Sequence, residues 1–270
     1  MSYKHFKVDL QNKIAHVAFN RPDKANALNM EAWQEMQAIF EGLSTNPEAR
    51  VVVLSGEGKH FCAGIDLELL MSVAGFQQVT CGGRRSEKIR DLVLKLQGCI
   101  NAIEKCAKPV LAAIHNGCIG GAVDIVTACD MRYSTTDAYF TVKEIDLGMV
   151  ADIGTLQRLP KLIAPGLAAE MAYTGRKVSG TEAQSMGLVN HTYPSKDALL
   201  EGVMQIAATI AAKSPVSIRG TKEVLRYTRD HGVDDALNYM ATWNAGMLLS
   251  EDLQEAFKAS MEKRAPVFKD

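Results

Sequence analysis

Short apolar runs that end at glycine or asparagine loops alternate with longer amphipathic segments over most of the chain. Residues 14–19 (IAHVAF) alternate between apolar and polar positions, which predicts a strand. The β-branched run VVVLSG at residues 51–56 is typical of a buried strand, and PVLAAIHNG at residues 109–117 predicts another. Each of these runs leads into a loop, so the pattern places strand ends and loops together.

The segments between these strands carry helical periodicity. From Met30 to Leu43, side chains recur on one face after Asn29, a plausible N-cap; they are Trp33, Met36, Gln37, Phe40 and Leu43. Between Ser86 and Cys106 a second stripe is formed by Ile89, Leu92, Val93, Leu96, Ile100 and Ile103. Helices between strands are the crossovers that parallel strands require, so we expect a layered α/β core.

From Ser195 onward the pattern changes to Ala- and Leu-rich helices, including residues 198–213 and a run from Asp234 to Met261. We therefore expect a core over residues 1–194 and a helical C-terminal region over residues 195–270. Helices of this kind, with small residues on their faces, can fold back on their own core or pack against another subunit. The sequence leaves both possibilities open.

The composition limits the classes of partner that the chain is expected to bind. The chain has 270 residues, 47% hydrophobic and 23% charged, and its 30 basic residues nearly balance its 31 acidic residues. The net charge is therefore close to zero, and the chain has no overall electrostatic field that would attract nucleic acid or a membrane surface. The six cysteines lack CxxC spacing, so we interpret them as reduced thiols and expect no metal site. The N-terminal residues show neither a signal nor a transit pattern, and a cytoplasmic location is expected.

Three acids stand out because their neighbours are apolar. Asp124, Glu144 and Asp152 lie in one stretch rich in glycine, valine, isoleucine, leucine and alanine. Removal from water raises the pKa of a carboxyl group, and a second carboxylate nearby raises it further. A single aspartate is often only a cap or a turn residue. Three in one apolar stretch indicate acid/base chemistry near neutral pH.

Two glycine-centred loops follow predicted strands. HFCAGIDL (His60–Leu67) comes after the strand at residues 51–56, and HNGCIGGAVD (His115–Asp124) comes after the strand that starts at Pro109. Backbone N–H groups at such strand ends can hold a developing oxyanion, and Ala63 and Gly121 are the candidates. The alternative is that these glycines serve tight turns and close helix packing. For the second loop the oxyanion interpretation is favoured, because this loop leads directly into Asp124.

A family resemblance is carried by ordered segments along the chain: FCAGIDL, NGCIGGAVDIVTACDMRY, KEIDLGMVADIGTLQRLP, TGRKVSGTEAQSMGLVN and KRAPVF. Together they resemble the crotonase (enoyl-CoA hydratase/isomerase) superfamily from about Ile14 to the C-terminus. The resemblance implies a spiral of ββα units with a helical C-terminal trimerisation region, assembled as trimers or dimers of trimers. It implies a coenzyme A thioester substrate, with no separate cofactor. It also implies an oxyanion hole at Ala63 and Gly121 and a CoA pocket lined by Lys24, Ala25, Ala27, Asp66 and Leu67.

The residues at the acidic positions indicate which group within this superfamily the chain resembles. Enoyl-CoA hydratases usually have glutamates at the positions of Asp124 and Glu144 and a glycine at that of Asp152, so this chain departs from their pattern. It is more similar to the isomerases that convert 3,5-dienoyl-CoA to 2,4-dienoyl-CoA. That reaction removes a proton at C2 and adds one at C6. We expect Asp152 to be the base at C2, Glu144 the acid at C6, and Asp124 a group that orients its neighbours and tunes Glu144.

Other functions stay open at this point. A hydratase using Asp124 and Glu144 is the nearest alternative, whereas acyl-CoA hydrolysis, dehalogenation or decarboxylation lacks a suitably placed histidine or nucleophile. We interpret His60 and His115 as structural residues. A non-catalytic crotonase-like binding protein, with affinity for RNA, is a third possibility. Its surface would be a basic stretch that we otherwise interpret as a solvated face or as contacts to CoA phosphates: Arg84, Arg85, Lys88, Arg90 and Lys95.

Overall fold

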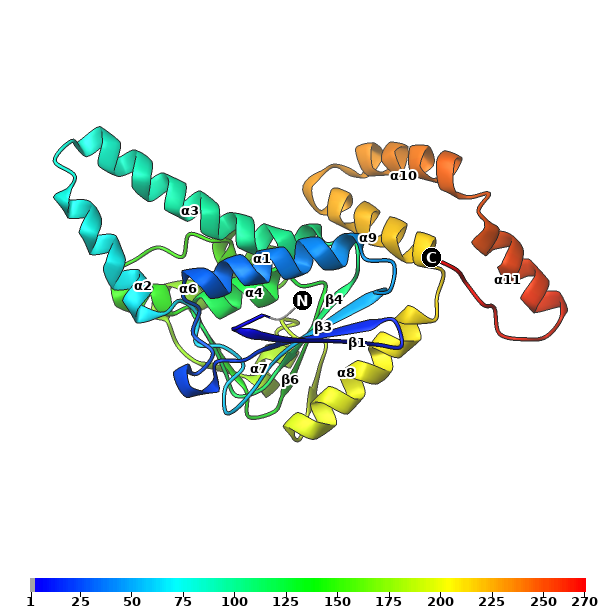
Figure 1. Cartoon of the computed structure of the whole chain (residues 1–270), viewed down its shortest axis with the longest axis horizontal. Helices are drawn as coiled ribbons and strands as arrows, with labels where there is room; N and C mark the ends of the chain where they lie inside the picture. Colours follow the sequence, from blue (N-terminus) through cyan, green and yellow to red (C-terminus); the bar gives the residue numbers. More distant parts are fainter. Residues whose placement is uncertain (1–2) are drawn as a thin grey trace.

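A six-stranded sheet forms the centre of the computed structural model, which describes residues 3–270 (Figure 1). Its strand order is β1-β2-β3-β4-β6-β9; β1 and β2 form an antiparallel hairpin, and the other neighbours are parallel. The strands are β1 (Phe6–Gln11), β2 (Ile14–Phe19), β3 (Val51–Gly56), β4 (Val110–Ile114), β6 (Met131–Thr135) and β9 (His191–Tyr193). The predicted parallel organisation is confirmed.

A second sheet has three short strands in the order β5-β7-β8; they are β5 (Gly117–Ile119), β7 (Tyr139–Thr141) and β8 (Val178–Ser179). The strand predicted over residues 109–117 is therefore divided between two sheets. Asn116 separates β4 from β5 in the left-handed backbone region, with φ of 50°. Asparagine tolerates that conformation better than most residues, and the turn redirects the chain into the second sheet.

One face of the large sheet is covered by α1 (Met30–Thr45), α3 (Gly82–Lys105) and α4 (Gly121–Ala128). The side chain of Asn29 accepts a hydrogen bond from the N–H of Ala32 at 2.9 Å, so the predicted N-cap of α1 is confirmed. Trp33 and Phe40 of α1 and Ile100 of α3 are fully buried in the main core. These helices place the start of α4 directly above the sheet.

The opposite face is covered by α8 (Lys196–Ala211), whose Leu199, Val203 and Ala207 share a second core with Val51 and Val53. Helix α8, which begins just after the expected boundary near Ser195, thus packs on the same sheet as the preceding residues. The helices beyond it are α9 (Pro215–Asp230), α10 (Val233–Met247) and α11 (Glu251–Met261). The predicted run from Asp234 to Met261 is two helices, and Ser250 caps the second.

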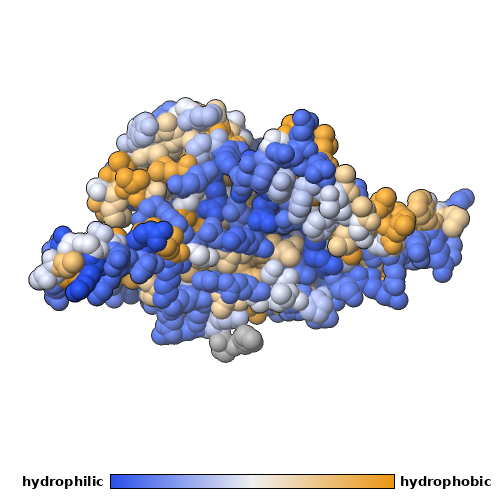
Figure 2. All heavy atoms as spheres, turned by 90° about the horizontal axis from the view of Figure 1, so that it is seen from above, coloured by the Kyte–Doolittle hydropathy of each residue, from blue (hydrophilic) through white to orange (hydrophobic). Residues whose placement is uncertain are grey.

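The C-terminal helices expose apolar side chains, and Figure 2 shows such side chains at that end of the molecule, on the right. More than half of the surface of each of the following residues is exposed in the single chain: Leu225, Val233, Leu237, Leu249, Phe257 and Met261. Extended apolar surface of this kind is typical of interaction sites. It fits the expected role of this region in subunit contacts.

The remaining helices are short and lie mostly in the connections: η1 (Pro22–Lys24), α2 (Leu67–Ser72), η2 (Val73–Gln78), η3 (Lys143–Leu147), α5 (Thr155–Arg158), η4 (Leu159–Lys161), α6 (Pro165–Thr174) and α7 (Gly180–Ser185). In Figure 1, α2, η2 and the first half of α3 form an arm that projects from the core. The basic residues of α3 are exposed on this arm, which fits a solvated face.

Within residues 3–270, no helix is long and apolar enough to cross a membrane. The same residues contain no group of three or more His, Cys, Asp or Glu side chains placed to hold a metal ion.

Candidate active site

A cleft of about 540 Å³ lies where the first residues of α2 and α4 approach η3. Most of the residues expected at the site line it: Lys24, Ala27, Ala63, Asp66, Leu67, Gly121 and Glu144. Ala25 does not line the cleft, and neither do Asp124 and Asp152. The cleft thus gathers the two glycine-centred loops and one of the three acids.

The backbone amide of Ala63 is not placed as the expected oxyanion donor. Its N–H donates to the carbonyl of Ala25 at 3.0 Å, so this bond holds the two loops together and directs the amide away from the cleft. The backbone N–H of Ile65, two residues on, has no acceptor in the part of the chain that the structure describes, and Ile65 lines the cleft. Ile65 therefore replaces Ala63 as the candidate oxyanion donor.

Ile65 and Gly121 bring their amides to the same point. Gly121 is the first residue of α4, where helix N–H groups lack intrahelical partners and the helix dipole is positive. A β-carbon on Gly121 would lie 3.6 Å from the Ile65 nitrogen, and one on Gly64 would lie 2.8 Å from the Gly121 nitrogen. Gly64 also has φ of +79°, so only glycine lets the two loops approach this closely.

Polar contacts fix the loop around Ala25 against the loop around Ile65. The buried side-chain amide of Asn26 lies within hydrogen-bond distance of the carbonyls of Glu57, His60 and Phe61, at 2.8, 2.9 and 3.1 Å. Arg21 donates to the carboxylate of Asp66 at 3.1 Å. Asp66 also caps α2 through the N–H of Glu68, so its carboxylate holds the loops together as well as lining the cleft.

Glu144 presents a carboxyl group that is only partly satisfied. It lies in η3, and its Oε2 is buried without a hydrogen-bond partner. Its Oε1 would be 3.3 Å from a β-carbon on Gly120, whose left-handed backbone leaves room for the carboxyl group. Burial raises the pKa of Glu144, and the charge of Asp152 acts in the same direction. A protonated Glu144 beside the Gly121 amide can donate a proton.

Asp124 lies behind the cleft in α4 and is fully buried. Its Oδ1 accepts the backbone N–H of Thr155 at 2.5 Å, whereas its Oδ2 has no partner in the described part of the chain. Burial raises the pKa of Asp124 to about 7, and the charge of Glu144 adds to this, against the opposing hydrogen bond from Thr155. Asp124 is thus placed to tune Glu144 without reaching into the cleft.

Asp152 departs from the expectation of two acids on facing walls. Its side chain is exposed and lies outside the residues that line the cleft, between the buried residues Ala151 and Ile153. Partial burial still raises its pKa, and its charge raises the pKa of Glu144 and of Asp124. The three acids therefore form one electrostatic group. In the single chain, however, Asp124 is the buried residue of this group and Asp152 is the solvent-exposed one.

Apolar side chains surround the open side of the cleft. Leu67 and Met71 of α2 are 63% and 75% exposed, and Leu147 and Val150 beyond η3 are 47% and 72% exposed. Leu67 and Leu147 line the cleft itself, together with Met149. Apolar atoms of a ligand in the cleft would cover Leu67, Leu147 and Met149.

Comparison with known proteins agrees with this geometry. Residues 9–270 match the family model described as enoyl-CoA hydratase/isomerase. The chain belongs to this family. The crotonase fold predicted from the sequence is confirmed by the crystal structure of enoyl-CoA hydratase from Bacillus anthracis, with a TM-score of 0.87, 30% identity, and coverage of 98% of this chain and 99% of that one.

Crotonase relatives with curated names are more similar in sequence. A peroxisomal protein of Arabidopsis thaliana, Delta(3,5)-Delta(2,4)-dienoyl-CoA isomerase, is 47% identical over 99% of this chain and 98% of its own length. The human mitochondrial protein of the same name is 46% identical over 97% of this chain and 81% of its own length. The family implies an acyl-CoA substrate for this crotonase.

Proposed function

We propose that this crotonase isomerises 3,5-dienoyl-CoA thioesters to 2,4-dienoyl-CoA thioesters. The observation that carries the proposal is a group of three carboxyls that act on one another, with two free amides in the same cleft as one of them. Glu144 is half-buried in the cleft, Asp124 is buried behind it, and Asp152 is exposed outside the lining. The names of the relatives from Arabidopsis thaliana and human support the same reaction.

The reaction balances with two carboxyl groups. The Asp152 carboxylate takes a proton from C2, and the electron pair moves through the conjugated chain while negative charge develops on the thioester oxygen. The N–H groups of Ile65 and Gly121 stabilise that oxygen; one such donor is worth about 3 kcal/mol in other enzymes. Glu144 then gives its proton to C6, which leaves double bonds at C2 and C4. The cycle closes when Asp152 loses a proton and Glu144 regains one.

The pKa values fit these assignments. Burial favours the neutral form of Glu144, which is the form that a proton donor requires. Asp152 is the more exposed of the two and ionises more readily as a base. The exposed apolar side chains around the rim provide a path for the acyl chain between them, and Lys24 at the cleft places positive charge near the CoA phosphates.

The similar Bacillus anthracis protein is an enoyl-CoA hydratase by name. A hydratase built on the present residues would use the first acid, Asp124, to activate water. Here Asp124 is fully buried, does not line the cleft, and accepts the Thr155 amide. The shorter aspartate therefore leaves no carboxylate at the place where a second glutamate would hold water. This arrangement favours isomerisation over hydration.

We also propose that the chain assembles as a homotrimer or a dimer of trimers through the exposed apolar surface of α9, α10 and α11. The expected location in the cytoplasm remains part of this proposal. The names of the relatives place those proteins in peroxisomes or mitochondria.

The direct test incubates the purified protein with a 3,5-dienoyl-CoA and records the ultraviolet absorbance of the conjugated 2,4-dienoyl thioester. We expect that absorbance to rise, with little loss of absorbance from crotonyl-CoA in a parallel hydration assay. Rapid hydration of crotonyl-CoA without isomerisation would instead assign the hydratase function. Tight binding of the thioester without any turnover would assign the non-catalytic binding function.

A further inference from the structure

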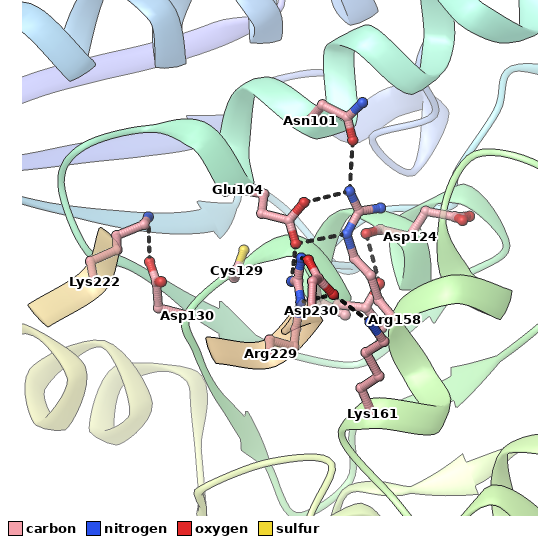
Figure 3. A network of polar contacts seen from close by, with 12 residues as sticks. Asn101, Glu104, Asp124, Cys129, Asp130, Arg158, Lys161, Lys222, Arg229 and Asp230 are labelled. Carbon is pink, nitrogen blue, oxygen red and sulfur yellow. Dashed lines mark hydrogen bonds and ion pairs between the residues drawn. The ribbon is translucent and has the colours of Figure 1, made fainter. Parts of the chain in front are cut away.

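Arg158 is a buried cation outside the cleft that the reaction itself does not use. It ends α5, and its side chain is 10% exposed. Its Nη2 donates to Oε2 of Glu104 at 2.9 Å and to Oδ1 of Asn101 at 2.7 Å, while its Nε donates to Oε1 of Glu104 at 3.2 Å. Figure 3 shows the guanidinium group bonded to these two α3 residues.

The guanidinium group is packed against the segment that carries the acids. A β-carbon on Gly154 would lie only 1.9 Å from Nη1 of Arg158, and Gly154 has φ of +140°, so glycine is required where the arginine folds under the start of α5. The next residue is Thr155, whose N–H donates to Asp124, and Asp152 lies two residues before Gly154. One arginine therefore contacts the middle of this segment.

Helix α3 holds the same segment at a second point. The side-chain amide of Gln97 donates to the backbone carbonyl of Asp152 at 2.7 Å. Gln97, Asn101 and Glu104 are spaced one helical turn apart on α3, so a single rigid face supports residues 152–158. Within residues 3–270 the Asp152 carboxylate accepts no hydrogen bond from another side chain. The position of the carboxylate thus depends on its backbone.

We propose that Arg158, held by Glu104, is a positioning residue that fixes residues 152–155 for proton transfer. Through Gly154 it sets the position of the exposed Asp152, and through the start of α5 it holds the Thr155 amide against Asp124. This inference rests on the proposed function for its effect on turnover. Its structural effect, the fixed geometry of residues 152–158, can be measured without the reaction.

The energetics of a buried ion pair agree with a positioning role. Burying two charges costs about as much as their attraction returns, so such pairs often contribute more to a unique geometry than to stability. Burial acts to raise the pKa of Glu104, but the hydrogen bonds from Arg158 and Arg229 outweigh it and hold this pKa below its ordinary value. Glu104 therefore remains a charged partner for Arg158 across the neutral range.

The other side of Glu104 offers a matched control. Arg229 of α9 also bonds Glu104 and pairs with Asp230, which in turn pairs with Lys161 (Figure 3). Arg229 is more exposed than Arg158, and in the described residues its hydrogen bonds go to Glu104 and Asp230, not to Gly154 or Thr155. Arg229→Ala removes one charge from the same glutamate while leaving the contacts of Arg158 in place.

The experiment compares Arg158→Lys and Glu104→Gln with Arg229→Ala. Arg158→Lys keeps the charge but loses the forked contact, and Glu104→Gln keeps the shape but loses the charge. For each folded variant we would measure kcat and KM for a 3,5-dienoyl-CoA, the dependence of kcat on pH, and backbone hydrogen exchange over residues 152–158. Hydrogen exchange at other buried segments reports any general loosening.

For both core variants we expect kcat to fall by about 10- to 100-fold with KM within about twofold, because a small displacement of a reacting group lowers its rate steeply. Hydrogen exchange should accelerate at residues 152–158 before other segments. The pH profile should shift upward, since a weaker Thr155 bond raises the pKa of Asp124; its other neighbours, Glu144, Asp152 and the Cys118 thiol, are unchanged. Arg229→Ala should leave all three readouts near those of the unsubstituted protein.

Unchanged exchange at residues 152–158 in both core variants would overturn the inference. So would exchange that rises equally throughout the chain, or an equal effect of Arg229→Ala. If the unsubstituted protein has no isomerase activity, the proposed function fails, whereas the exchange measurement still decides whether Arg158 fixes this segment. If that protein is active and the core variants match it, only the inference fails.

Discussion

The backbone N–H of Thr155 donates to Oδ1 of Asp124 across 2.5 Å, while Oδ2 of the same carboxyl is buried without a partner in the described part of the chain. One oxygen is thus stabilised as an anion and the other is not. Burial dominates and brings the pKa of Asp124 to about 7, which makes this inner acid responsive to changes near neutral pH.

Asp124→Asn should make stability less dependent on pH. An acid whose pKa rises from 3.8 to about 7 on folding destabilises the native state progressively as pH increases through that interval. The difference in unfolding free energy between the unsubstituted protein and the variant should therefore shift by about 4 kcal/mol, toward the variant, between pH 4 and pH 8. Urea unfolding at several pH values measures it. Parallel stability curves would contradict the assigned pKa.

Glu144→Gln and Asp152→Asn should separate the two proton transfers. Each should lower isomerase kcat by about 10²- to 10⁴-fold, the usual loss when a general acid or base is removed. Exchange of the C2 proton with deuterated water, followed by NMR, should be lost in Asp152→Asn but survive in Glu144→Gln. The reverse pattern would exchange the two roles.

Gly64→Ala should disrupt the pair of amides. The added β-carbon would lie 2.4 Å from the carbonyl of Ile119 and 2.8 Å from the nitrogen of Gly121, so the loops must separate. We expect kcat to fall by about 10²- to 10³-fold, as when an oxyanion donor is lost. A steady-state assay with a 3,5-dienoyl-CoA measures this loss.

Gly42→Ala is the matched control for that change. Gly42 lies within α1, and no atom would come within 4 Å of an added β-carbon. Helix propensity should make this variant more stable by about 0.5–1 kcal/mol, with unchanged activity. A loss of activity in Gly42→Ala equal to that in Gly64→Ala would show that the effect at position 64 is not local.

Leu249→Asp should weaken the proposed assembly. Leu249 is 90% exposed in the single chain, at the junction of α10 and α11. A charge in a subunit contact costs far more than one in water, so light scattering should show smaller species than for the unsubstituted protein. Lys263→Asp, at an exposed polar position nearby, should leave the mass unchanged. An unchanged mass for Leu249→Asp would place the subunit contact elsewhere.

Much of the large sheet and its covering helices could be predicted because their periodicity is local. The strands at residues 14–19 and 51–56 and the cap at Asn29 follow from side-chain pattern alone. The short strands of the second sheet could not be predicted, since three-residue strands carry too little periodicity and depend on tertiary partners. The break at Asn116 could not be predicted either, because it depends on the left-handed backbone of a single residue.

The acids of the site could be predicted because their side chains contrast with apolar neighbours. The oxyanion donor could not, because every residue has an amide and only the fold decides where it points. Ala63 was a reasonable choice until the structure placed its N–H on Ala25. The supporting role of Arg158 could not be predicted from the sequence either, because its partner Glu104 lies 54 residues away.

The side-chain amide of Asn26, which is neutral, ties the loop around Ala25 to the loop that presents Ile65. Backbone hydrogen bonds from Cys62 to Gly117 and from Ile119 to Cys62, both of 3.1 Å, tie that loop in turn to the one that presents Gly121. A carboxamide does not ionise and is little affected by ionic strength. Acidification would therefore protonate the titrating carboxyls while these neutral contacts between the loops stayed in place. Such inhibition should reverse at once when neutral buffer is restored, with no refolding phase.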